Sequence, residues 1–291
     1  MGMDFDFLLY WKNDMELCCA ENNNSGRIKM QNIKLLSKFY LVLLKSKMEY
    51  RLNFALEIGI NIFTYLVTYL GTWVILNKFH TINGWNLYEV MILYNMNLVT
   101  YGIACLFFYI PFRNLENILV NGEFDSYLTK PVNPFIYLIL RQNYLGFLSH
   151  IVLGMIMFAL CLQKVEIDWS MSRIFAFISA ITGGTLIQAS IIIATGALNI
   201  KLVRANALMD AFIYNVRSFV EYPIDLYPTF IQCVVTFIIP YALINYYPAA
   251  YIFRKTTTFC VALPLVIGGL MFAGAYALFM YLLRYYQGTG T

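Results

Sequence analysis

Charged residues are scarce in this chain: only 12% of its 291 residues are Asp, Glu, Lys or Arg, against roughly 25% in an ordinary soluble domain. Hydrophobic residues make up 60%. This composition excludes a soluble globular domain. A membrane span takes roughly 20 apolar residues, so the length leaves room for about six spans with short connections.

Motifs for catalysis or ATP binding are also absent from the sequence. No Gly-Lys-Ser or Gly-Lys-Thr occurs, so the chain has no phosphate-binding loop of its own. The only two histidines are His80 and His150, which lie far apart, and there is no Gly-x-Ser-x-Gly elbow. We therefore expect a protein that is not an enzyme.

Neither the cysteines nor the net charge indicates a metal site or a nucleic-acid-binding surface. The six cysteines (Cys18, Cys19, Cys105, Cys161, Cys233 and Cys260) are scattered and have no metal-ligand spacing. We expect no metal and no cofactor in this chain. The net charge of +4 bears on membrane topology rather than on nucleic-acid binding.

Long uncharged runs are what the sequence does contain. There are six, at residues 58–77, 90–112, 142–163, 174–198, 226–253 and 256–283. They are apolar on all sides, as membrane-spanning helices are. The predicted fold is all-α: a polytopic membrane protein with six transmembrane helices.

The N-terminal part differs from the rest. Residues 1–29 lack the apolar core of a signal peptide and are predicted to be a cytosolic tail, before a single transmembrane domain over 30–291. Residues 32–52 have the pattern of an amphipathic helix at the membrane interface. Seven basic residues precede the first span: Arg27, Lys29, Lys34, Lys38, Lys45, Lys47 and Arg51. The positive-inside rule places them, and both termini, in the cytosol. Arg254 and Lys255 do not fit this orientation.

Polar residues between 201 and 225 leave the fifth span open. In one alternative this segment is cytosolic or interfacial, and 226–253 is the span. In the other, 205–222 is a polar-lined span and 229–253 dips into the membrane and returns, since Pro240 and Pro248 interrupt its helix.

An unusually long stretch, 111–131, separates the second and third runs. Its apolar residues have helical spacing, and Gly122 divides it into two short amphipathic pieces. This pattern predicts a docking element for a soluble partner, with Phe124 as an apolar anchor. The alternative is an interfacial helix lying on lipid.

Three segments carry a resemblance to a known family. Residues 121–134 (NGEFDSYLTKPVNP) are similar to the G-E-L-D-x-x-L-x-x-P-x-N-P segment of permease subunits of type-2 ATP-binding-cassette (ABC) exporters. Residues 222–228 with 245–249, and the terminal 284–290, resemble further segments of that family. The match runs from about residue 30 to the end, with Phe124 at a position where the family usually has Leu.

The resemblance implies the permease subunit of an ATP-driven exporter. Two permease chains, identical or homologous, would form the path for an amphipathic or hydrophobic substrate in the plasma membrane, and cytosolic ABC ATPase subunits would hold the ATP and Mg. The coupling helix, about 113–130, would dock the ATPase through Leu115, Ile118, Leu119, Gly122, Glu123, Phe124, Tyr127 and Leu128. The alternative function is a stand-alone secondary transporter or channel.

Two smaller features have two explanations each. Arg217 and Glu221, at i and i+4, either line the pathway or form a structural pair. Gly269, Ala273 and Ala277 permit close helix contact. That contact is expected within the chain rather than at a dimer seam.

Overall fold

The computed structural model describes residues 51–79, 81–130, 132–142, 144–202, 204–256 and 260–286. The predicted tail 1–29 lies outside these residues, as does all but the end of the predicted interfacial helix 32–52. The described residues are largely helical and contain no β-strand, which confirms the all-α class.

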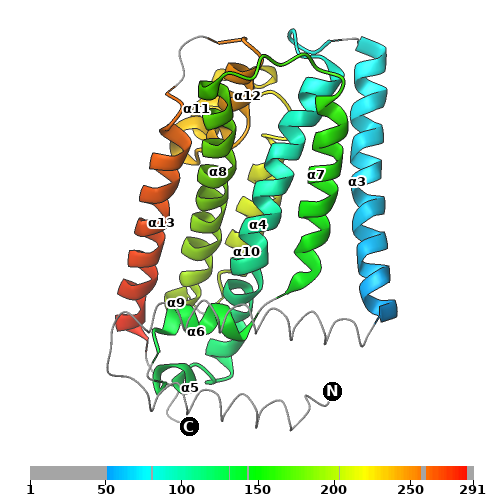
Figure 1. The fold of residues 1–291 in the computed structure, drawn as a ribbon. Coiled ribbons are helices and arrows are strands. Elements are labelled where there is room, and N and C mark those ends of the chain that lie inside the picture. The colour runs from blue at the N-terminus through cyan, green and yellow to red at the C-terminus, as the bar shows by residue number, and fades with distance from the viewer. Residues whose placement is uncertain are drawn as a thin grey trace.

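Five long helices run side by side through the molecule (Figure 1). They are α3 (Arg51–Phe79), α4 (Leu87–Val120), α7 (Leu148–Leu162), α8 (Met171–Ala197) and α13 (Leu263–Leu282). Each, α7 together with the preceding turn 145–147, is long and apolar enough to cross a membrane, and a bent helix pair raises the number of candidate spans among the described residues to 6. The polytopic membrane fold is therefore confirmed.

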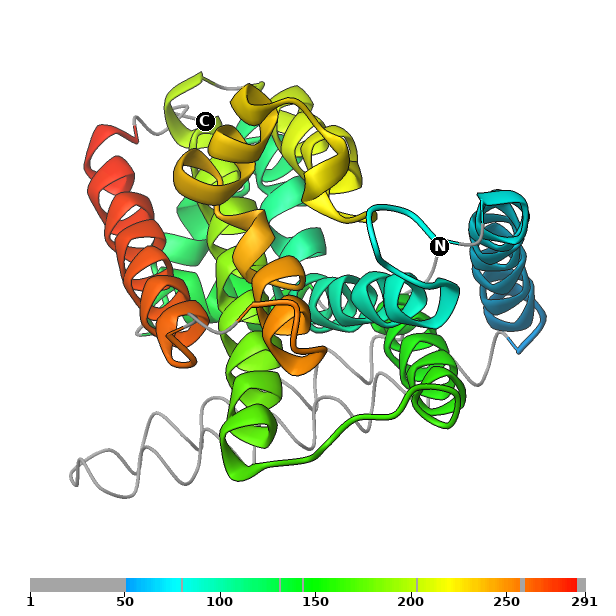
Figure 2. The same ribbon diagram turned by 90° about the horizontal axis from the view of Figure 1, so that it is seen from above.

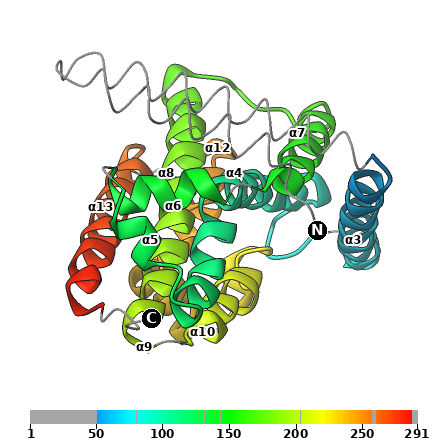
Figure 3. The same cartoon turned by 90° about the horizontal axis from the view of Figure 1, so that it is seen from below.

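Short helices gather at the two ends of this bundle. At one end, α5 (Asp125–Leu128) and α6 (Pro134–Arg141) lie across the bundle, as the view from below shows (Figure 3). We call this the α5 end. At the other, α12 (Tyr246–Ile252) follows α11 (Thr229–Cys233), as the view from above shows (Figure 2). We call this the α12 end. Two further short helices, α9 (Asn199–Leu202) and α10 (Asn206–Asp210), follow α8.

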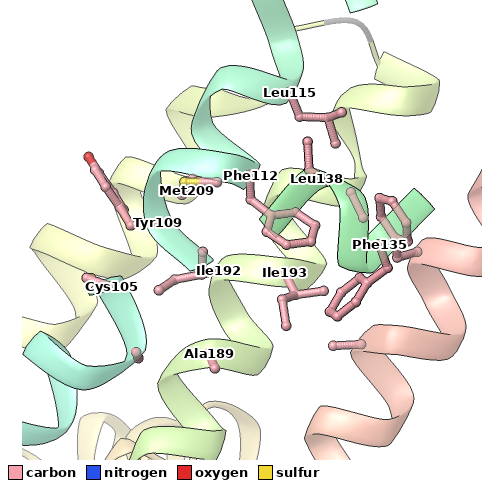
Figure 4. Packing of buried hydrophobic residues seen from close by; sticks show 14 of the residues in the cluster. Cys105, Tyr109, Phe112, Leu115, Phe135, Leu138, Ala189, Ile192, Ile193 and Met209 are labelled. Atoms are coloured by element: carbon pink, nitrogen blue, oxygen red, sulfur yellow. The ribbon is translucent and has the colours of Figure 1, made fainter. Parts of the chain in front are cut away.

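Helix α4 is at the centre of the fold. It packs against both α7 and α8, and α8 packs against α13. Phe112 and Leu115 of α4 are fully buried and meet Phe135 and Leu138 of α6 in the largest core cluster (Figure 4). By contrast, α3 stands at the edge and exposes most of its large apolar side chains, as a lipid-facing helix does (Figure 2).

Helices α8 and α13 approach each other most closely at two glycines. A Cβ on Gly183 would lie 2.3 Å from the backbone of Pro264, and one on Gly268 would lie 2.5 Å from the carbonyl oxygen of Gly183. The predicted contact of 269, 273 and 277 within the chain is therefore wrong: a Cβ on Gly269 would meet nothing within 4 Å, and the two alanines are exposed. Helix α13 has apolar residues on all of its sides, so its sequence alone does not show which small residues face the rest of the bundle.

We expect Gly268→Ala to destabilise the chain by about 1–3 kcal/mol, because its methyl group would meet backbone and the two helices would have to separate. Gly269→Ala, one residue further on, should not lower stability, because its methyl group would meet nothing within 4 Å and alanine favours the helix over glycine. The measurement is the midpoint of thermal unfolding of the purified protein in detergent. Equal midpoints for the two variants would contradict the close approach of α8 and α13.

Ion pairs at the α12 end neutralise the two basic residues that did not fit the predicted orientation. Arg254 pairs with Asp168, which precedes α8. The Lys255 ammonium lies 2.9 Å from the Glu89 carboxylate in the first turn of α4 and 4.6 Å from the centre of the Trp85 ring. Both basic residues are thus paired with acidic side chains.

The run 226–253 is two helical pieces, 229–238 and 241–252, which meet at an angle of 77°. Its apex reaches into the bundle: the Tyr241 hydroxyl donates to the carbonyl oxygen of Phe212 at 3.2 Å. The buried Asn245 amide donates to the carbonyl oxygen of Val220 at 2.5 Å. The bent pair is therefore tied to the segment that precedes it.

That preceding segment, 206–222, extends from one end of the bundle to the other. The Asn206 side chain donates to the carbonyl oxygen of Arg113, near the α5 end of α4, at 3.0 Å. Asp225, just beyond the segment, accepts at its carbonyl oxygen from the Asn83 side chain at the α12 end, at 3.2 Å. The segment thus follows the full depth of the bundle.

Candidate functional site

One face of the segment 206–222 carries polar side chains that the described chain leaves accessible. We call Asp210, Tyr214, Ser218 and Glu221 the polar stripe, since they recur every three or four residues. Tyr214 and Ser218 are exposed, and the Asp210 and Glu221 side chains keep 38% and 23% of their surface accessible.

Arg217 lies behind the stripe, at mid-depth. Its guanidinium group is 4.1 Å from the centre of the Tyr101 ring, near the middle of α4. It is 3.6 Å from the Glu221 carboxylate, with only 12% of its side chain exposed, and its buried Nε atom has no hydrogen-bond partner among the described residues. The structure thus brings the sequence-predicted pair together.

Accessible polar groups at this depth have a physical consequence. Ionisable and polar side chains inside a membrane normally face a water-filled cavity or other protein, because hydrocarbon does not solvate them. The stripe is accessible in the single chain. Such a stripe is typical of a surface that faces an aqueous passage or another protein chain.

The second group of predicted site residues surrounds the turn between α4 and α5. Residues 113–120 form no separate helix: α4 continues through Pro111 to Val120. The chain then turns at Gly122, whose φ of +70° favours glycine, and α5 follows. We call residues 117–130 the α4–α5 turn.

Most apolar side chains predicted to dock an ATPase are buried within the chain itself. The exposed fractions are 0% for Leu115, Phe124 and Tyr127, 4% for Ile118 and 8% for Leu119. Phe124 packs against Tyr127 and Tyr286, with ring centres 5.7 Å and 5.1 Å apart. The prediction that Phe124 is an exposed anchor is therefore wrong, because helical spacing identifies the apolar side of a helix but not what covers it.

Helix α6 holds the turn from the other side. The Tyr137 ring lies edge-on to Tyr127 at 5.0 Å, and the Arg141 guanidinium lies 4.9 Å from the centre of the Tyr127 ring. Burial, opposed in part by the charge of Arg141, raises the pKa of Tyr137. This hydroxyl stays neutral at physiological pH, so the support for the turn does not depend on its ionisation.

The outer face of the turn remains available to a partner. Its exposed side chains are Asn117, Val120, Asn121, Glu123, Ser126, Leu128, Thr129 and Lys130. Val120 and Leu128 keep 50% and 44% of their surface accessible. Two apolar side chains among polar ones form a small surface of the kind that contacts another protein.

The residues that the structure describes contain no candidate metal site. No group of three or more His, Cys, Asp and Glu side chains lies close enough to hold a metal ion there. His150 packs between the rings of Tyr65 and Tyr101, at 5.2 and 5.8 Å. Its surroundings are those of a core residue.

Sequence reasoning missed the partner of Asp210. Arg113 of α4 forms an ion pair with Asp210, 97 residues further along the chain. No local pattern links the two positions, so only the packing of the segment against α4 reveals the pair.

Comparison with known proteins identifies the family. Residues 62–290 match the ABC-2 family transporter proteins. No curated protein and no solved structure matches the chain. The matched range includes α4, α7, α8 and α13, most of α3, the α4–α5 turn and the polar stripe. The chain therefore belongs to the ABC-2 transporter family and is a permease of that family.

Proposed function

We propose that this chain is the membrane-spanning subunit of an ATP-driven exporter, paired with a second permease chain and with cytosolic ATPase subunits. The observation that carries the proposal is the polar stripe, accessible at membrane depth in a member of the ABC-2 family. One stripe lines one side of a passage, so a second permease chain, identical or homologous, supplies the other side. The substrate class is amphipathic or hydrophobic.

In this proposal the segment 206–222 is the fifth span and 229–253 is re-entrant. The hydrogen bonds of Asn206 and Asp225 to opposite ends of the bundle support the first assignment. The 77° bend and the contact of its apex with Phe212 support the second. Backbone breaks at membrane depth are tolerated where protein surrounds them.

The α5 end is cytosolic in this proposal, and both termini lie on that side of the plasma membrane. The basic residues before the first span support this orientation. Arg254 and Lys255 lie at the opposite, α12 end and are exceptions to the rule, which counts basic residues rather than net charge; there they pair with Asp168 and Glu89.

The exposed face of the α4–α5 turn docks the ATPase in this proposal. ATP and Mg belong to that partner, and closure of its two copies moves the turns and shifts the passage between inward and outward access. This requires two packings of similar free energy that nucleotide biases.

A passage predicts water at the stripe. We expect Ser218→Cys to react with a water-soluble maleimide in native membranes at least ten times faster than Leu270→Cys, a position on α13 that is 69% exposed and predicted to face lipid. The comparison uses a background in which all cysteines except the buried Cys105 and Cys161 are replaced by serine. Equally slow labelling of both sites would contradict an aqueous passage at the stripe.

A docking surface predicts loss of the ATPase when its centre is changed. We expect Glu123→Lys with Leu128→Asp to lower the amount of co-purified ATPase about thirtyfold, equivalent to about 2 kcal/mol of binding free energy, because both side chains are exposed. The matched control is Glu166→Lys, an exposed acid at the α12 end. Undiminished co-purification of the double variant at normal chain abundance would place the docking surface elsewhere.

A further inference from the structure

The α5 end of α4 is fastened to the polar stripe by side chains. Arg113 directs both of its terminal nitrogens to the Asp210 carboxylate. The same guanidinium donates to the Tyr109 hydroxyl at 3.0 Å, and that hydroxyl shares a hydrogen bond with the Tyr214 hydroxyl at 2.8 Å. Two of the four stripe residues are thus bound to α4.

The backbone at the start of the segment is fastened to the same part of α4. The Asn206 side chain donates to the carbonyl oxygen of Arg113 at 3.0 Å. Its backbone N–H donates to the Glu116 carboxylate at 3.3 Å. Asn199, the first residue of α9, donates to the Asn206 side chain at 3.2 Å, so the attachment includes the connection that leads into the segment.

The same stretch of α4 continues without a break into the α4–α5 turn. Arg113 lies seven residues before the end of the helix at Val120, a distance of about 10 Å at 1.5 Å per residue. Leu115, between them, is fully buried in the core. A rigid helix transmits displacement of its end, so movement of the turn displaces Arg113.

We infer that Arg113 is a positioning residue that transmits movement of the α4–α5 turn to the polar stripe through Asp210 and Tyr109. The inference rests on the proposed function and adds the route between the docking surface and the passage. The Arg113 and Asp210 side chains are 35% and 38% exposed, and ion pairs this accessible contribute little to folding stability. The pair can therefore be removed without unfolding the chain.

The test measures the response of the stripe to nucleotide in the complex with the co-purified ATPase. Ser218→Cys, in the background described above, is labelled with a water-soluble maleimide with and without ATP and vanadate. We expect at least a fivefold change of labelling rate in the parent, and less than twofold in Arg113→Leu. Co-purification and hydrolysis of ATP should be retained in that variant. The charge-reversed pair, Arg113→Asp with Asp210→Arg, should recover the nucleotide response.

The matched control is Arg254→Asp with Asp168→Arg, which reverses an exposed ion pair at the α12 end. Its labelling rate should change with nucleotide as much as that of the parent. A parental response in Arg113→Leu, or no recovery in the reversed pair, would overturn the inference. No ATPase or no nucleotide response in the parent would instead overturn the proposed function. If Arg113→Leu does not accumulate in the membrane, Asp210→Asn, which keeps the side-chain size, is measured in its place with the same expectations.

Discussion

Replacing Phe124 by alanine is expected to lower the free energy of unfolding by about 3–5 kcal/mol, the usual cost of truncating a buried aromatic side chain. The ring is fully buried and packs on Tyr127 and Tyr286, so its loss leaves a cavity beneath the α4–α5 turn. The measurement is the midpoint of thermal unfolding of the purified chain. Binding of the ATPase should fall as well, because the exposed face of the turn loses its support.

The matched control for Phe124→Ala is Leu128→Ala. Leu128 lies in the same turn but keeps 44% of its surface exposed, so its truncation should change stability by no more than about 0.5 kcal/mol. An unchanged melting midpoint for Phe124→Ala, combined with loss of ATPase binding, would restore the interpretation of Phe124 as an exposed anchor.

Removing Glu221 alone is the second change with a large expected effect. Glu221→Leu leaves the guanidinium of Arg217, which is 12% exposed, without its acid. Glu221 itself is 23% exposed, so the expected cost is about 1–3 kcal/mol, that of leaving a mostly buried polar group without its partner, rather than that of breaking a fully buried pair. We expect a marked loss of folded protein. The measurements are the amount of protein that elutes as a monodisperse peak from size-exclusion chromatography in detergent, and the midpoint of thermal unfolding.

The double variant Arg217→Leu with Glu221→Leu separates the two explanations of this pair. Replacing both charges by apolar groups restores much of the stability in either case. If the pair lines the pathway, the recovered protein is folded but exports nothing and its ATP hydrolysis is uncoupled. Restored export would assign the pair a structural role alone.

The sequence predicts the long helices well, because each apolar run is uninterrupted by charge. The runs 58–77 and 174–198, for example, lie almost entirely within α3 and α8. It leaves the region 201–253 open, because a span with polar residues and a bent apolar pair each violate the simple hydropathy pattern. The choice there depends on tertiary hydrogen bonds such as those of Asn206 and Asn245, which no local pattern contains.

The candidate site is predicted only in part. The pair of Arg217 and Glu221 follows from its spacing of four residues. The orientation of Phe124 does not follow from the sequence, because its neighbour Tyr286 is more than 160 residues away in the chain. The ion pair of Arg113 and Asp210 is not predictable for the same reason, since its two residues are also distant in the chain. Contacts distant in sequence decide which face of an amphipathic helix is covered by its own chain.

The central claim is that a separate ATPase subunit drives this chain. It is tested most directly by purifying the tagged full-length chain from its native membranes, identifying its partners by mass spectrometry and measuring ATP hydrolysis. The account predicts a co-purifying ABC ATPase at about one copy per permease chain, ATP hydrolysis by that complex, and none by the chain once the ATPase has been removed. A chain that purifies without any ATPase and still moves a substrate across reconstituted vesicles, or that hydrolyses ATP alone, would contradict it.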